Sequence, residues 1–244
     1  MSKLDVLAIG AHPDDVELGC GATVALLVEQ GLKVGILHLT RGESGTRGSG
    51  EEREAEARAA AAALGATLVD YLDCGDGSLR HGEAEEDALI EKLRLYRPDL
   101  VLSPAPSDRH PDHGRAHRLV ADACFYSGLR RRAAGRGGEP HRPATNFSYM
   151  QNDAFEPSFI VDVSRTWEKK VAALAAYSSQ LYGPSSAARA EPATKVASRE
   201  FAQGVEGRAR HFGVLIGVEF GEPFWSRQPL AVADPMAVVP RGLR

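Results

Sequence analysis

The sequence has few cysteines and no long apolar run, and each absence narrows the class of protein. Three cysteines stand in 244 residues without a Cys-x-x-Cys spacing, which excludes a disulfide scaffold and is typical of a reducing compartment. The longest purely apolar run extends from Val171 to Tyr177, whereas a membrane-spanning helix needs roughly 20 apolar residues. The first ten residues hold too short an apolar run for a secretory signal peptide. We therefore expect a cytoplasmic protein without a membrane segment.

The chain also has no excess of positive charge. Its 29 Lys and Arg residues against 33 Asp and Glu residues give a net charge of −4, whereas a nucleic-acid-binding protein usually carries a basic excess or a basic face. Apolar residues make up 43% and charged residues 25%, as in ordinary globular proteins. A chain of this length forms a core without the help of a metal. Any metal that it binds is therefore free to serve chemistry.

Strand-like and helix-like segments alternate through the first half of the chain. The predicted strands are residues 4–9, 33–39, 67–72 and 99–103, and the predicted helices are residues 21–30, 51–64, 83–96 and 114–126. Such alternation is typical of parallel strands joined by crossover helices. We expect an α/β fold with a Rossmann-like, doubly wound, mostly parallel sheet that carries helices on both faces and the site at the C-terminal ends of its strands.

The second half is expected to extend the same domain. Strands are predicted at residues 158–163 and 212–220 and helices at 166–179 and 195–210, while four prolines from residue 223 onward predict an irregular tail that wraps the domain or meets a neighbouring subunit. Residues 130–143 are basic and rich in glycine and proline, which predicts a surface loop. No linker divides the chain, so we expect one domain over residues 1–244, with a core at about 1–128 and a C-terminal extension at about 145–244 packing on it.

The loop after the first predicted strand reads Ala11-His12-Pro13-Asp14-Asp15. A dinucleotide-binding loop would have Gly-x-Gly-x-x-Gly here, but His12 and Asp15 occupy the second and third glycine positions. Two adjacent carboxylates repel each other unless a cation or a shared proton relieves the repulsion. One interpretation is a divalent metal bound by His12 and one of the acids, and the other is a carboxylate that caps the following helix.

A second loop of the same kind follows the fourth predicted strand. It ends in His110-Pro111-Asp112-His113, so that a strand end again leads into a proline-stiffened loop with imidazoles and carboxylates. The first and fourth strands of a doubly wound sheet are neighbours, and their loops open onto one crevice. Histidines and aspartates that converge from two loops at the ligand end of the sheet favour a metal site.

Together, the two motifs resemble the paired signature of the LmbE/PIG-L-like zinc N-deacetylases. The similarity covers nearly the whole chain and is strongest to the branch that acts in bacillithiol biosynthesis. The segments that carry this second resemblance are residues 40–48, 53, 157–159, 167–170, 177–180, 215–218 and 221–224. The chain departs from the pattern at residues 130–139, where its arginine- and glycine-rich insert has no counterpart.

The resemblance implies a metal site with three protein ligands, namely His12, Asp15 and His113. Catalytic zinc sites keep three protein ligands and leave the fourth position open. Two nitrogens and one carboxylate suit Zn2+, and Fe2+ accepts the same set.

The resemblance also implies catalytic roles for three further residues. Asp14 would be the general base, and a protonated His110 would stabilise the oxyanion formed from the acetamide. Asp112 would orient an imidazole of the site, although its position before the fourth predicted helix also suits a helix cap.

Two arginines are candidates for substrate binding. In the resembled branch the substrate is N-acetylglucosaminyl L-malate, whose carboxylates suit arginine. Arg53 stands at the start of a predicted helix, where a cation is unfavourable to the helix dipole. It is therefore either an anion clamp or a solvated surface charge. Arg109, beside His110, is a weaker candidate.

The sequence leaves alternatives open. The substrate could be a different N-acetylglucosaminide, a chitooligosaccharide or the amide of a thiol conjugate. A non-catalytic metal-binding module is disfavoured because Asp14 is retained and structural zinc sites are closed. The expected partner is a small acetylated amino sugar, not nucleic acid or membrane, and the resemblance implies a homo-oligomer, a hexamer or a trimer.

Overall fold

The computed structural model describes residues 3–183 and 194–239. In these residues seven strands form one sheet in the order β3-β2-β1-β4-β5-β7-β6. The strands are β1 (Val6–Gly10), β2 (Val34–His38), β3 (Leu68–Tyr71), β4 (Leu100–Pro104), β5 (Thr145–Tyr149), β6 (Phe159–Asp162) and β7 (Gly221–Ser226). Neighbouring strands pair in parallel except at β7, which is antiparallel to both β5 and β6. The expected mostly parallel α/β fold is confirmed.

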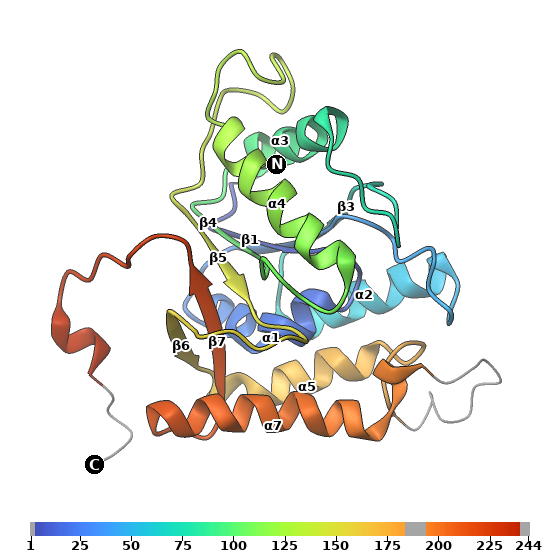
Figure 1. The fold of residues 1–244 in the computed structure, drawn as a ribbon, viewed down its shortest axis with the longest axis vertical. Coiled ribbons are helices and arrows are strands. Elements are labelled where there is room, and N and C mark those ends of the chain that lie inside the picture. Colours follow the sequence, from blue (N-terminus) through green and yellow to red (C-terminus); the bar gives the residue numbers. More distant parts are fainter. Residues whose placement is uncertain (1–2, 184–193, 240–244) are drawn as a thin grey trace.

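Helices cover both faces of the sheet (Figure 1). The longer helices are α1 (Asp15–Glu29), α2 (Gly50–Leu64), α3 (Glu83–Tyr96), α4 (Pro111–Tyr126), α5 (Trp167–Ala176) and α7 (Arg199–Ile216). Side chains of β1 alternate between two cores: Leu7 and Ile9 pack with α3 and α4, whereas Val6 and Ala8 pack on the side of α1, α2 and α5. This alternation is the period of two that a buried strand requires.

The C-terminal part of the sheet differs from the prediction. The predicted strand at 212–220 is wrong, because α7 continues to Ile216 and Gly217, at φ 74°, ends it. The proline-rich segment that follows was expected to be irregular but begins with β7. Pro223 faces Ile160 of β6, while pairing with β5 starts only at Phe224. Pro223 thus lies outside the pairing between β7 and β5, and a strand tolerates proline where one of its sides is unpaired.

One strand and two helix starts were also missed. The strand β5 was not predicted at all, α1 begins six residues earlier than expected, at Asp15, and α4 begins at Pro111. Proline is favoured in the first turn of a helix because its missing N–H has no partner there in any case. Both helices therefore start inside the histidine–aspartate motifs, which places the motif side chains at helix N-termini.

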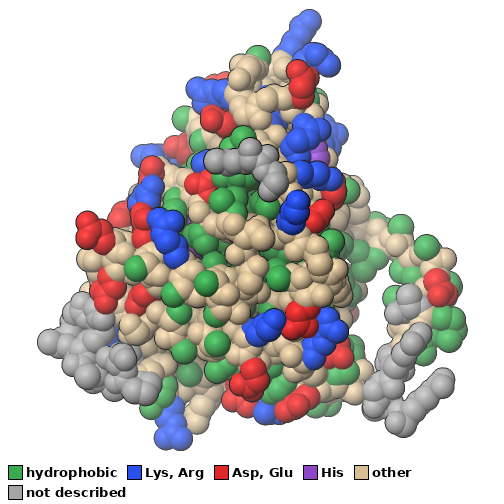
Figure 2. Space-filling view, turned by 180° about the vertical axis from the view of Figure 1, so that it is seen from behind, with side chains coloured by type: hydrophobic (Ala, Val, Ile, Leu, Met, Phe, Trp, Pro, Cys, Tyr) green, Lys and Arg blue, Asp and Glu red, His purple; other side chains and the backbone are tan. Residues whose placement is uncertain are grey.

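Residues 227–239 form an arm that leaves the body of the molecule after β7 (Figure 1). The arm carries exposed apolar side chains, and Figure 2 shows them standing clear of the body. Those with the largest exposed fractions are Val232, Met236 and Val238. The arm does not wrap its own domain, which was one of the two expectations. No helix among the described residues has the length and apolar character needed to cross a bilayer.

Candidate active site

The site lies where the loops after β1 and β4 meet. The two strands pair directly, from Val6 with Leu100 to Ala8 with Leu102, as the sequence predicted. Above their carboxyl ends is a pocket of about 270 Å³. Its lining contains His12, Asp14, Asp15, Arg53, Arg109, His110 and His113, together with Asp76, Gln151 and Asn152. Every candidate residue except Asp112 therefore lines one pocket.

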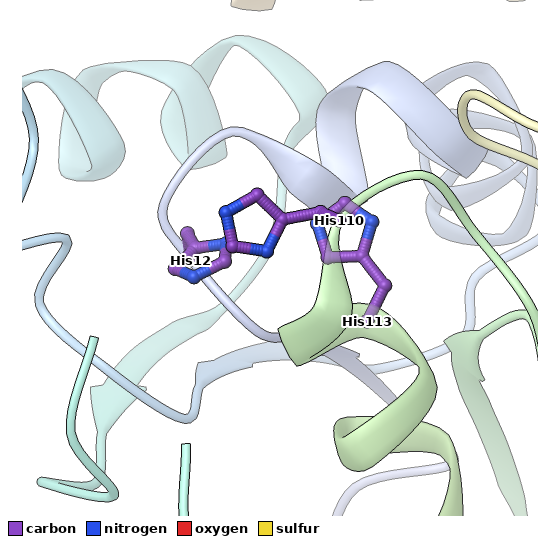
Figure 3. A group of neighbouring side chains, drawn as sticks. All are labelled: His12, His110 and His113. Carbon is purple, nitrogen blue, oxygen red and sulfur yellow. The ribbon is translucent and has the colours of Figure 1, made fainter. Parts of the chain in front are cut away.

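Among the three residues predicted to bind metal, Asp15 contacts both histidines. The Asp15 carboxylate stands between the two imidazoles, with one oxygen 3.2 Å from His113 Nε2 and the other 3.5 Å from His12 Nδ1. Figure 3 shows the rings of His12, His110 and His113 grouped together, the first from the loop after β1 and the others from the start of α4. A nitrogen from each of these rings lies within 4.8 Å of the other two. His110 is thus close enough to contact a substrate group bound at the predicted metal site.

In both predicted histidine ligands, the ring nitrogen that does not face Asp15 contacts another carboxylate. His113 Nδ1 lies 2.9 Å from Asp108, and His12 Nε2 lies 3.3 Å from Asp112 and 3.2 Å from Asp76. Such contacts fix the tautomer and orientation of metal-binding histidines. Burial alone would lower the pKa of His113, but the facing carboxylates raise it to about 9. This donor set, with one side open to the pocket, fits a divalent metal ion.

Asp112 is fully buried and does not cap α4. Its oxygens accept hydrogen bonds from the backbone N–H groups of Gly77 and Leu79, at 2.8 and 3.2 Å. The cap of α4 is His110, whose Nδ1 accepts from the Asp112 N–H at 3.2 Å. Of the two interpretations of Asp112, the structure therefore agrees with the contact to an imidazole.

Asp14 has an unusual backbone conformation and a raised carboxyl pKa. Its backbone φ of 101° is unusual for a residue other than glycine, and its side chain makes no capping hydrogen bond to α1. Such strain is maintained only where the surrounding structure demands it. Burial and the neighbouring charge of Asp15 raise the pKa of Asp14 to about 7. The capping interpretation of the doubled aspartate is therefore wrong for Asp14, and Asp15 instead accepts a hydrogen bond from the His12 N–H at 2.8 Å.

His110 lies partly buried beside the other two histidines of the site. Burial and the positive charges of His12 and His113 lower the pKa of the His110 imidazole. A bound cation would lower this pKa further, because like charges disfavour protonation. The Nδ1 of His110 accepts the Asp112 N–H, so its other ring nitrogen is the one that can carry a proton toward the pocket.

The two candidate arginines have different surroundings. Arg53 is buried and donates to the backbone carbonyls of Gly42 and of Pro13, the second at 3.3 Å. The interpretation of Arg53 as a solvated surface charge is therefore wrong. Arg109 is exposed at the rim of the pocket.

Four polar residues of the site, Asp76, Asp108, Gln151 and Asn152, were missed from the sequence. Asp76 follows β3 in a glycine-flanked turn that carries no motif. Asp108 accepts hydrogen bonds from the N–H of His110 and from both nitrogens of Asn152. Gln151, which follows the unpredicted strand β5, donates to Asp15. Only Asp108 had a usable signal, since it lies two residues before the second motif.

Comparison with known proteins identifies the family of this chain. The model of the PIG-L family, the GlcNAc-PI de-N-acetylases, matches residues 7–124. The diacetylchitobiose deacetylase of Thermococcus kodakarensis is 34% identical over 189 residues, which cover 72% of this chain and 69% of that protein. The chain therefore belongs to the PIG-L/LmbE family, and its activity class is that of an N-deacetylase.

Two further relatives show how similar the fold is and how far the reaction varies. The conserved protein TT1542 of Thermus thermophilus has a TM-score of 0.85 and 37% identity, with 95% of this chain and 98% of that chain covered. The 4-oxalmesaconate hydratase of Pseudomonas putida is 30% identical, with 69% of this chain and 70% of that protein covered. Since a hydratase shares this similarity, the substrate has to be argued from the site.

Proposed function

We propose that the protein hydrolyses the N-acetyl group of an N-acetylglucosaminide with zinc as the metal, and that its substrate is N-acetylglucosaminyl L-malate of bacillithiol biosynthesis. The observation that carries the proposal is the contact of the Asp15 carboxylate with both His12 and His113, with Asp14 beside them in the same open pocket. A metal centre with a free side and an adjacent base is what amide hydrolysis needs.

The metal ion would contribute positive charge that polarises the acetamide carbonyl and lowers the pKa of a water molecule. Zn2+ suits the two nitrogens and one carboxylate, and Fe2+ is compatible with them. Asp112 and Asp108 hold the two ligand imidazoles from behind, so that the donor atoms face the pocket before a metal binds.

The protein side chains then divide the proton transfers. Asp14 takes a proton from a water molecule while the water oxygen forms a bond to the acyl carbon. Asp14 later gives that proton to the departing nitrogen. The carbon–nitrogen bond breaks, and the products are acetate and the free amine. A base with a pKa of about 7 suits both directions of transfer near neutral pH. His110 donates its N–H to the oxygen on which negative charge develops.

The malate part of the substrate is assigned to the arginines of the pocket. Arg53 lies in the pocket wall, and Arg109 stands exposed at the rim. Two separated cations match the two carboxylates of malate, and the Arg fork binds carboxylates well. A chitooligosaccharide is the second candidate, since a diacetylchitobiose deacetylase is among the relatives.

We also propose that the protein works in the cytoplasm as a homo-oligomer, a hexamer or a trimer. The arm at residues 227–239 supports this, since its apolar side chains are exposed on a single chain. Apolar groups that stay in water gain free energy when a neighbouring copy covers them.

The experiment that tests the substrate compares three compounds. Zinc-loaded protein is incubated with N-acetylglucosaminyl malate, diacetylchitobiose and N-acetylglucosamine, and the released amine is measured, with Asp14→Asn as the inactive control. The expected result is fastest turnover of the malate conjugate. Equal turnover of all three would remove the argument for an acidic aglycone, and no amine from any of them would contradict the deacetylase proposal.

A further inference from the structure

The helix that carries Asp15 is broken one turn after it begins. Within α1, Cys20 has φ −145° and ψ 22°, so that the residues before and after it form two separate helical pieces. Gly19 and Gly21 flank the break, and Gly19 lets the Tyr149 ring approach so closely that a Cβ would overlap it. Glycine pairs are a common cause of sharp kinks. A break of this kind leaves backbone carbonyls and N–H groups without helical partners.

A buried ion pair fills the break. Lys170 Nζ of α5 donates to the Leu18 carbonyl at 2.9 Å, where the first piece ends. Glu222 of β7 accepts from the N–H groups of Ala22 and Thr23 at 3.2 and 2.7 Å, where the second piece begins. The two side chains bind each other at 2.6 Å and are only 3% and 2% exposed. A cation therefore meets the C-terminal end of one helical piece and an anion the N-terminal end of the next, as helix dipoles favour.

The same break is linked to the predicted metal ligand. Arg208 of α7 donates to the Leu18 carbonyl at 3.2 Å and also to the carbonyl of Gln151. The side chain of Gln151 in turn donates to Asp15. The piece of α1 that begins with Asp15 is thus held at its far end by Lys170 and Arg208, and at its near end through Gln151.

We propose that Lys170 and Glu222 are positioning residues of the deacetylase, which keep α1 divided so that the Asp15 carboxylate faces His12 and His113. This rests on the proposed function, which makes Asp15 a metal ligand. If α1 continued as one straight helix, its first turn would take a different direction and Asp15 would move with it. The resemblance had already singled out both residues through the segments at 167–170 and 221–224, without giving either a role.

The test removes each charge and measures metal binding as well as turnover. Lys170→Met deletes the donor to Leu18. Glu222→Gln keeps the side-chain volume but sets an amide NH2 against a backbone N–H of α1. The control is Lys169→Met, at the preceding residue of α5, whose side chain is 44% exposed and pairs with Glu29 at the other end of α1. For each variant the zinc dissociation constant is measured by competition with a chelator, alongside kcat, KM and the thermal unfolding midpoint.

Positioning predicts that both variants bind zinc about 10–100-fold more weakly and lose kcat by a similar factor with little change in KM. The control should match the wild type. A purely structural role would lower the unfolding midpoint while zinc affinity and kcat of the folded protein stay unchanged, and that result would overturn the proposal. If Lys170→Met does not fold, the isosteric Glu222→Gln decides alone.

The wild type and Asp15→Asn separate this proposal from the one on which it rests. If the wild type releases no amine, the proposed function fails, and if Asp15→Asn retains full zinc binding, the assignment of Asp15 as a metal ligand fails. If those two measurements agree with the proposed function but Glu222→Gln binds zinc like the wild type, only the positioning role fails.

Discussion

Replacing Arg53 by alanine tests the substrate from inside the protein. In the structure the guanidinium is buried and donates to the carbonyls of Gly42 and Pro13. Burial raises the pKa of Asp14, and the charge of Arg53 partly offsets that rise. Arg53→Ala should therefore reduce kcat/KM for every substrate by a shared factor, because the loop before α2 and the turn that carries Asp14 lose a common tether.

A malate carboxylate bound by Arg53 adds a second, selective loss. One hydrogen bond to a charged group is worth about 1.5–3 kcal/mol, which corresponds to a further loss of roughly 10–150-fold in kcat/KM. The assay measures amine release from N-acetylglucosaminyl malate and from N-acetylglucosamine, and the quantity that matters is the ratio of the two losses. The matched control is Arg58→Ala on the same helix, whose side chain is 61% exposed. Equal losses for both substrates would refute the anion clamp and leave Arg53 only the structural role of its hydrogen bonds to the backbone.

Five further substitutions test the site and the fold. His113→Ala should abolish stoichiometric zinc binding in elemental analysis, since two protein ligands rarely hold catalytic zinc; full occupancy would contradict the ligand set. Asp14→Asn should keep zinc but slow turnover by about 10²–10⁴-fold, whereas Asp15→Asn should weaken zinc binding, and the reverse pattern would exchange the two roles. Asp108→Asn should weaken zinc binding by about 10–100-fold in a chelator competition; unchanged affinity would show that Asp108 does not support His113. Asp70 tests acid stability: burial alone would raise its pKa, but hydrogen bonds from Lys92 and Tyr96 hold that pKa below its usual value. The ionised Asp70 therefore stabilises the folded state above roughly pH 4, and this stabilisation is lost as the pH falls through the lower, folded-state pKa. The melting temperatures of wild type and Asp70→Asn should differ at neutral pH and converge in acid. A difference that stays constant with pH would contradict this.

The alternation of strands and helices and the two histidine–aspartate motifs could be predicted from the sequence. Both follow from local chemistry: apolar runs of strand length alternate with helical segments, and the carboxyl ends of parallel strands meet at one edge of the sheet. The meeting of His12 and His113 was therefore predictable once β1 and β4 were expected to be neighbours. By contrast, β5 was missed because it is short and partly polar. The strand β7 was missed because it contains a proline, which a strand tolerates only where it does not pair on both sides; Pro223 lies outside the pairing with β5.

The surroundings of the motif residues were decided by the tertiary structure alone. Asp76 and Gln151 reach the site from loops far along the chain, and no spacing in the sequence connects them with His12 or Asp15. The burial of Arg53 likewise depends on a glycine-rich loop that folds over it. Each of these contacts joins segments that are distant in sequence, and its free energy exists only when the packed sheet and helices bring the partners together and exclude water from them.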